Sequence, residues 1–176
     1  MTLPHWLRRI TRATAAWSPI LLLLAATAPA AQAASQACAH LVTGTYLSRI
    51  VDAQGNLLSR SILNFHAGGT LLSLDSNQAG IPGQFNPFTS NTGEWACTGR
   101  TSLIASILSF TLPGTEVPQP GLARNNFDFR IDPRTGNLEG SLELIFYPLE
   151  GDPLNGVGIV AATASITAQP LVLRPR

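Results

Sequence analysis

The stretch Asn125–Pro148, NNFDFRIDPRTGNLEGSLELIFYP, contains two runs of alternating side chains around one turn. Large apolar residues share one face of each run: Phe127, Phe129, Ile131, Leu138, Leu142, Leu144 and Phe146. Alternation with a period of two residues is typical of half-buried strands. Between the runs, residues 132–137 (DPRTGN) combine Pro, Gly and Asn, which favour tight turns. The stretch therefore predicts a β-hairpin.

The same alternation recurs along the chain and predicts eight strands with no amphipathic helix. The expected strands are 41–51, 57–66, 70–75, 93–99, 101–112, 124–131, 137–147 and 157–168. Short turns join most neighbours, which favours antiparallel pairing in sequence order. Eight strands in this order can close and leave no exposed edge. We therefore predict an all-β fold, a single eight-stranded antiparallel meander closing into a β-barrel, with a β-sandwich as the alternative.

The first 33 residues have the composition of a secretory signal peptide. Three Arg residues between positions 8 and 12 precede the short apolar run 20–26, and Ala31-Gln32-Ala33 fits the small-x-small cleavage pattern. The apolar run is much shorter than the roughly 20 residues that span a bilayer. We expect cleavage after Ala33 and a secreted or periplasmic protein without a stable membrane span.

The expected domain organisation is a signal peptide over 1–33, a β-barrel domain over 34–168 and a C-terminal tail over 169–176. Removing 33 of the 176 residues leaves 143, which suffices for one domain with a real core. This part has eight Arg, ten acidic residues and no Lys, hence a formal charge of −2. A weakly acidic domain with scattered Arg does not fit nucleic-acid binding. The composition, rich in Ala, Gly, Pro and Arg, suggests a bacterial source.

The mature part contains two cysteines, Cys38 and Cys97. An even number of cysteines in an exported chain favours a disulfide bond. Two unrelated buried thiols are the alternative. The bond would tie the start of the barrel domain to its middle.

Two long polar loops, Ser76–Gly93 and Pro113–Ala123, interrupt the strands. Loops of this length in a compact domain are usually functional or mobile. In the first loop, Ile81, Phe85 and Phe88 either cover a cavity as a lid or anchor a surface loop. The sequence leaves both roles open.

No residue pattern indicates a catalytic, metal or cofactor site. The mature chain has only His40 and His66, and neither stands in a recognisable spacing with a nucleophile and a carboxylate. Two His without free thiolates do not make a zinc site. We therefore expect no metal, no cofactor and no catalytic residue, and favour a protein that is not an enzyme.

The inward face of the barrel supplies a candidate binding site. Its expected lining residues are Tyr46, Arg60, Trp95, Phe127, Phe129, Leu142, Leu144 and Phe146. Such a lining suits a small hydrophobic ligand, oriented by a few polar groups. Alternatively, the same side chains simply fill the interior. Arg60 shares a face with Ile62 and Asn64, and alternation does not decide which face of that strand is inside.

Several short motifs resemble those of known small barrels. Gly44-Thr45-Tyr46 resembles the Gly-x-Trp signature of lipocalin-like (calycin) barrels, with Tyr in place of Trp. Residues 65–70 (FHAGGT) and 93–99 (GEWACTG) resemble the spacing in small bacterial lipocalin-like and avidin-like barrels. The pattern is also similar to allene-oxide-cyclase-like and dirigent-like barrels. These resemblances imply an eight-stranded barrel, but no ligand-binding residue carries over from them.

Three functions are compatible with these observations. The leading hypothesis is an exported barrel, monomeric or weakly oligomeric, that binds a small apolar ligand without catalysis. The second is a barrel cyclase or dirigent-like enzyme that shapes a reactive small molecule, assisted by Arg60, Tyr46 or Glu143. The third is a structural or surface interaction domain whose long loops carry the contacts.

Overall fold

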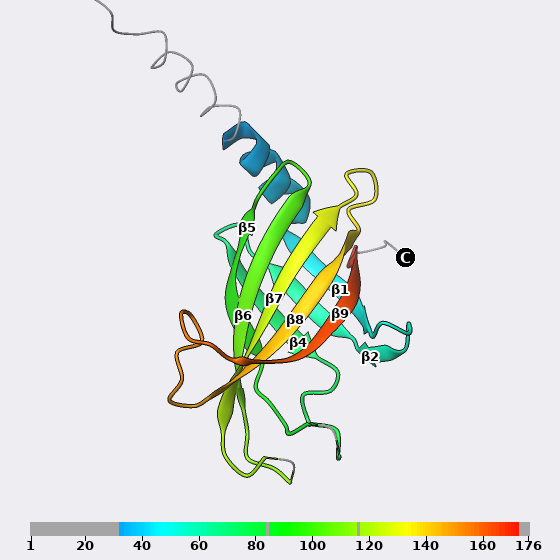
Figure 1. Ribbon diagram of the computed structural model, residues 1–176. Helices are drawn as coiled ribbons and strands as arrows, with labels where there is room; N and C mark the ends of the chain where they lie inside the picture. The colour runs from blue at the N-terminus through cyan, green and yellow to red at the C-terminus, as the bar shows by residue number, and fades with distance from the viewer. Residues whose placement is uncertain (1–31, 84, 116, 173–176) are drawn as a thin grey trace, which may run out of the picture.

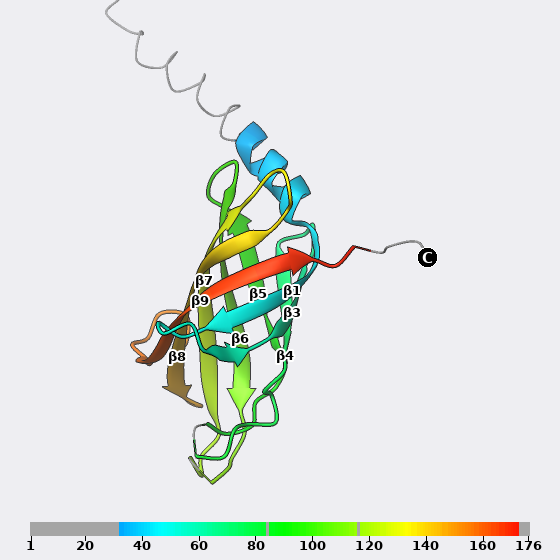
Figure 2. The same cartoon turned by 90° about the vertical axis from the view of Figure 1, so that its right-hand side faces the viewer.

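The computed structural model describes residues 32–83, 85–115 and 117–172, and it forms one closed antiparallel sheet (Figures 1 and 2). The strands are β1 Gly44–Val51, β2 Leu57–Ser59, β3 Ser61–Phe65, β4 Thr70–Asp75, β5 Asn91–Cys97, β6 Ser102–Thr111, β7 Gly121–Ile131, β8 Leu138–Pro148 and β9 Ile159–Pro170. From β3 to β9 each strand pairs with the next, and β1 pairs with both β3 and β9. The predicted eight-stranded antiparallel barrel is confirmed.

The part of the chain that the structure describes has nine strands where eight are expected, because the predicted strand 57–66 is interrupted at Arg60. Its two parts, β2 and β3, both pair with β1, through Ile50 opposite Ser59 and Leu47 opposite Ile62. The register shifts between Ile50 and Val51. β2 is therefore a continuation of β3 beyond an irregularity.

The pairing of β1 with β9 closes the barrel, and it covers only part of β9. The paired residues run from Tyr46 opposite Pro170 to Val51 opposite Ser165. Along residues 159–164, β9 pairs with β8 alone. The wall of the barrel consequently ends in a free strand edge over this stretch.

A helix over residues 32–42 covers one end of the barrel, although the sequence pattern predicts no amphipathic helix. The segment is rich in Ala, the residue with the highest helix propensity. Cys38 and Val42, one helical turn apart, are fully buried against the barrel interior. A helix this short gains its stability from such packing, which a single-sequence pattern does not reveal.

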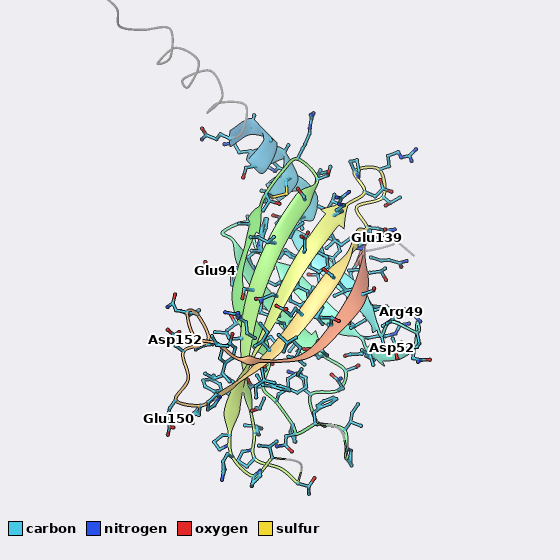
Figure 3. All side chains as sticks on the ribbon, viewed as in Figure 1. Arg49, Asp52, Glu94, Glu139, Glu150 and Asp152 are labelled. Atoms are coloured by element: carbon cyan, nitrogen blue, oxygen red, sulfur yellow. A yellow bond between two sulfur atoms is a disulfide. The ribbon has the colours of Figure 1, made fainter. Side chains whose placement is uncertain are left out.

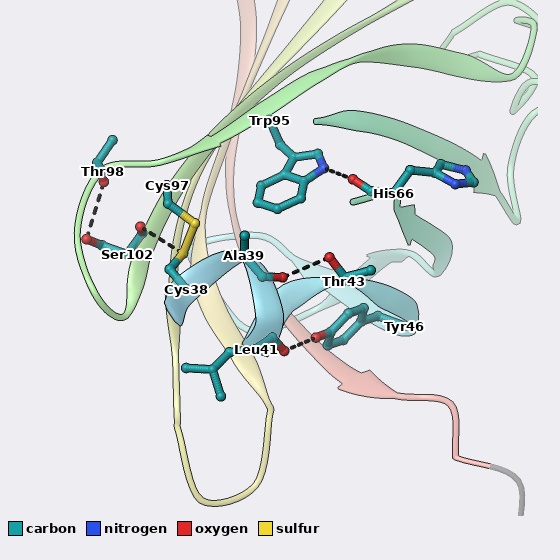
Figure 4. The surroundings of a disulfide bond; sticks show 10 residues. All are labelled: Cys38, Ala39, Leu41, Thr43, Tyr46, His66, Trp95, Cys97, Thr98 and Ser102. Atoms are coloured by element: carbon teal, nitrogen blue, oxygen red, sulfur yellow. Dashed lines mark hydrogen bonds between the residues drawn. A yellow bond between two sulfur atoms is a disulfide. The ribbon is translucent and has the colours of Figure 1, made fainter. Parts of the chain in front are cut away.

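The predicted disulfide bond is confirmed and fastens this helix to the barrel (Figure 4). Cys38 in the helix is bonded to Cys97 at the end of β5, across 59 residues of sequence. Beside it, the Tyr46 hydroxyl donates a hydrogen bond of 3.2 Å to the Leu41 carbonyl. The bond and the buried face of the helix together seal this end.

The half of the interior next to the helix is packed with aromatic rings. Phe65 is at the centre, with edge-to-face contacts to Tyr46, Trp95 and Phe129 at centroid distances of 5.6, 5.8 and 6.2 Å. Phe127 stacks on Phe129 at 5.4 Å. Rings at these separations contribute beyond the area that they bury. This half of the barrel is a filled core.

The two ends of the barrel differ in their connections. Short turns at 66–69, 98–101 and 132–137 surround the helix, whereas the longer loops 76–90, 112–120 and 149–158 gather at the opposite end (Figure 1). Charged side chains such as Arg49, Glu94 and Glu139 lie on the outer surface (Figure 3). The end with the long loops is therefore the one available for a site.

The predicted signal peptide lies almost entirely in residues 1–31, outside the described part of the chain. Across residues 32–83, 85–115 and 117–172, no helix has the length and apolar character needed to cross a membrane.

The disulfide bond should make a large contribution to stability. Replacing both cysteines (Cys38→Ala with Cys97→Ala) is expected to lower the free energy of unfolding by about 4 kcal/mol, because the unfolded chain regains the freedom of a long loop. Urea denaturation followed by tryptophan fluorescence measures the change. Wild type unfolded in dithiothreitol is the control and should match the double variant. Equal stability of the double variant and the oxidised wild type would contradict the expectation.

Candidate functional site: a cavity at the open end of the barrel

The half of the barrel away from the helix encloses a cavity of about 780 Å³. This volume lies within the range of small-molecule sites, roughly 300–1,000 Å³. The apolar lining residues include Ile50, Leu58, Ile81, Phe85, Phe88, Ala123, Leu142, Leu144, Phe146, Ile159, Ala161, Ala162 and Ala164. The polar ones are Ser59, Asn77, Asn86, Ser109, Thr111, Gln119, Asn125 and Tyr147. No Arg, His, Asp or Glu occurs among the described lining residues.

The loop 76–90 covers part of this cavity with apolar side chains. Ile81, Phe85 and Phe88 all line it, and the rings of Phe85 and Phe88 are 6.2 Å apart. Isolated bridges join Ile81 to Phe85 and Phe88 to Thr111 at the end of β6. Of the two roles that the sequence leaves open for these side chains, the structure supports that of a cover.

The loop 149–158 folds back over the outside of the barrel near the same end. Arg124 on the outer face of β7 lies 5.4 Å from the centre of the Tyr147 ring and donates a hydrogen bond to the Pro153 carbonyl. Asp152 accepts backbone hydrogen bonds from Leu154 and Asn155 at 2.9 and 3.1 Å. These contacts fix the loop, and with it the start of β9, against the cavity wall.

A band of hydrogen-bonded polar side chains separates the packed half from the cavity, and we call it the polar band. Its members are Ser61, Ser73, Asp75, Asn91 and Asn125. They come from β3, β4, β5 and β7, so the band crosses half of the barrel. Asn125 is its member that lines the cavity.

Asp75 is the acceptor at the centre of the polar band. Its Oδ1 accepts hydrogen bonds from the hydroxyl groups of Ser61 and Ser73, and its Oδ2 accepts from Asn91 Nδ2 at 2.6 Å. Burial raises the pKa of Asp75 above its usual range, and these three hydrogen bonds oppose the rise. The carboxyl group is thus held inside the barrel by neutral donors.

Seven of the eight residues expected to line the pocket point into the barrel. Those lining the cavity are Leu142, Leu144 and Phe146. Those belonging to the packed half are Tyr46, Trp95, Phe127 and Phe129, each at most 7% exposed. The predicted set therefore contains both the filling and the lining side chains, because the same inward face runs the full length of each strand.

Arg60 is the exception: it is expected to point into the barrel, but its side chain lies on the outer face. It is exposed at the break between β2 and β3, and the inward neighbours are Ser59 and Ser61. The alternation of residues in the sequence does not reveal the polar band, for a related reason. Polar residues at alternate positions, such as Ser73 and Asp75, are typical of a solvent-facing side. The signal that identifies them is that they share a face with the buried Leu71.

No metal centre is evident in the part of the chain that the structure describes, where no three His, Cys, Asp or Glu side chains gather to hold an ion. The candidate site is therefore the cavity itself.

Comparison with known proteins leaves the family open. No protein-family model matches the chain, and no curated protein does. Among solved structures, the chain is similar to one described as EF1p2_mFAP2b bound to DFHBI, with 14% sequence identity over 78% of this chain and 99% of the other. The TM-score is 0.35, which is too low to support any conclusion. The closed eight-stranded barrel agrees with the lipocalin-like resemblance at the level of architecture alone.

The two halves of the interior should respond differently to truncation on the same strand. Leu138→Ala removes a fully buried side chain from the packed half and is expected to lower the free energy of unfolding by about 2–5 kcal/mol. Leu144→Ala enlarges an existing cavity and should lower it by less than roughly 1.5 kcal/mol. Urea denaturation of both variants measures the difference. Equal losses would mean that the cavity half is packed in solution.

Asp75 should give the stability of the protein a distinctive pH dependence. Because its pKa is raised in the folded state, folding favours the protonated carboxyl, so its stabilising contribution is complete below the unfolded pKa of about 3.9 and is lost as the pH rises through the folded pKa. The stability of wild type relative to Asp75→Asn should therefore decrease as the pH rises from 3 to 8.

Urea denaturation at several pH values measures this difference. Asp52, Asp132 and Asp152 have lowered pKa values and the opposite effect, but they are common to both proteins and cancel. Asp128→Asn removes the same charge from the outer face of β7 and controls for net charge. A difference that is constant with pH would contradict the assignment.

Proposed function

We propose that this chain is an exported barrel protein that binds a small hydrophobic ligand in the cavity at its open end, without catalysis. The observation that carries the proposal is the cavity of about 780 Å³, whose described lining is mostly apolar and has no charged side chain. An apolar molecule gains about 25 cal/mol for each Å² of its surface that leaves water. A lining without charged groups allows this gain without burying an ion.

The construction of the barrel supports this proposal. The helix and the disulfide bond seal one end, and the packed half forms a rigid base. The opposite end has the long loops and the stretch 159–164, where β9 lacks a partner on one side. We propose that the ligand enters at this end, where movement of the loop 76–90 does not disturb the core.

Export is part of the proposal and rests on the sequence and on the disulfide bond. Residues 1–33 would be removed, and the barrel domain would begin at Ala34. The Cys38–Cys97 bond fits the oxidising conditions of a periplasm or the exterior. The lipocalin-like resemblance agrees with ligand carriage, which is the finer part of the proposal.

A neutral fluorescent dye tests the binding function. N-phenyl-1-naphthylamine, whose emission rises in apolar surroundings, should bind the exported, oxidised protein with one site per chain. Leu144→Trp places a larger side chain in the cavity and should weaken dye binding at least about tenfold, because it occupies the volume that the dye needs. Fluorescence titration measures both affinities.

The matched control is Ile104→Trp, which adds the same ring to the outer face of β6, where Ile104 is 48% exposed. Its dye affinity should stay within about twofold of wild type. Equal dye binding by Leu144→Trp and Ile104→Trp would mean that the dye binds outside the cavity and would contradict the proposed site. The intact mass of the exported chain, expected to match residues 34–176, checks the export part.

A further inference from the structure

Ser109 presents an unused hydroxyl group at the cavity. Its side chain points inward from β6, is 4% exposed and lines the cavity. The Oγ atom is buried and has no hydrogen-bond partner. A buried hydroxyl without a partner is unfavourable, and most such groups in folded proteins are satisfied. Ser109 is therefore a group for which a ligand can supply the missing partner.

Asn125 presents a second polar group, and the polar band determines its orientation. Asn91 directs Nδ2 at Asp75 Oδ2, which accepts the hydrogen bond, and keeps Oδ1 for its other neighbour. Asn125 must then direct Nδ2 at Asn91 Oδ1, which it does at 3.2 Å. This leaves Asn125 Oδ1 toward the cavity, with no side-chain partner among the described residues.

The two groups are close enough to act on one ligand atom. In the ladder between β6 and β7, Ile107 is opposite Asn125 and Ser109 is opposite Ala123. Ser109 and Asn125 are thus diagonal neighbours on the inward face, with Cα atoms roughly 7 Å apart. A hydroxyl oxygen between the two side chains can make two hydrogen bonds of about 2.8 Å.

The surroundings disfavour an anionic head group at this position. The described lining contains no Arg or His, and Arg124, next to Asn125 in sequence, is on the outer face against Tyr147. Asn125 Oδ1 is itself an acceptor and would face the oxygens of a carboxylate. The Asp75 carboxyl lies behind it, one Asn side chain away. A buried anion without a cation or donors is strongly unfavourable.

We propose that the cavity selects an uncharged ligand with an apolar body and a single hydroxyl group. This hydroxyl donates to Asn125 Oδ1 and accepts a hydrogen bond from Ser109 Oγ. The apolar body lies against Leu142, Leu144 and Phe146 toward the open end. The inference depends on the proposed function, because it specifies the ligand class of the same cavity.

Three probes of matched chain length test this selectivity by displacing N-phenyl-1-naphthylamine at pH 8, below micelle formation. Dodecan-1-ol has both a donor and an acceptor, dodecyl methyl ether has only an acceptor, and dodecanoate is charged. The alcohol should displace the dye with an apparent Kd about tenfold lower than that of the ether or of dodecanoate. Isothermal titration calorimetry checks each affinity directly.

Ser109→Ala removes the hydroxyl that donates to the oxygen of both the alcohol and the ether, so it should weaken the binding of each about fivefold. The preference for the alcohol over the ether rests on donation to Asn125 Oδ1 and should remain. The change removes no hydrogen bond within the protein, so the variant should fold as wild type does. The control is Ser106→Ala on the outer face of the same strand, where Ser106 bonds Asn126, and it should keep both affinities.

The outcomes separate the two proposals. Equal displacement by all three probes, or a preference for dodecanoate, overturns the inference but leaves the cavity a binding site. Affinities for the alcohol and the ether that are both unchanged in Ser109→Ala also overturn it. If the dye and all three probes fail to bind, the proposed function fails and the inference fails with it.

Discussion

The hydrogen-bonded pairing of β1 with β9 is the constraint on which the rest of the structure depends. Residues 46–51 pair with residues 165–170, and this pairing turns a meander into a closed wall. Closure makes the inward residues of all strands face one interior, so side chains distant in sequence become neighbours. Because the pairing stops at Val51 and Ser165, the wall is complete around the packed half and interrupted beside the cavity.

The interior of the barrel is filled from one end only. At the helix end, the ring of Phe65 touches three other aromatic rings, and Cys38 and Val42 close the remaining space. At the other end, Ser109, Ala123 and Ala164 take the place of large side chains, and the volume stays open. A packed base of this kind supplies the stability that a hollow half cannot. The same strands thus stabilise the fold with one half and line the cavity with the other.

Much of the fold follows from the alternation of apolar and polar residues alone, because nearly every strand of a closed barrel has one face toward the interior and one toward solvent. The hairpin around residues 132–137 and the order of the strands are confirmed for this reason. The helix is not visible in this way, since its short Ala-rich sequence becomes helical by packing against an end that exists only in the closed barrel.

The division of the site is likewise a matter of three-dimensional packing. Alternation identifies Phe129 and Leu144 as inward residues. It does not reveal that Phe129 fills the core whereas Leu144 lines the cavity. On the strand containing Arg60, both faces carry apolar residues, Ile62 on one and Leu63 on the other. Pairing with β4, where Leu71 and Ser73 face inward, decides the question against Arg60.

The partly buried Asp75 shows why the polar band differs from an ordinary core. A carboxyl group inside a barrel is unfavourable, and apolar residues of similar volume would often stabilise the fold more. What the carboxyl provides is direction: as an acceptor it orients Asn91, and Asn91 orients Asn125. Two side-chain amides that are free to face either way without these hydrogen bonds are held in one arrangement. Through these hydrogen bonds, the Asp75 carboxyl group fixes an acceptor at the cavity, on the side where the hydroxyl of Ser109 has no partner.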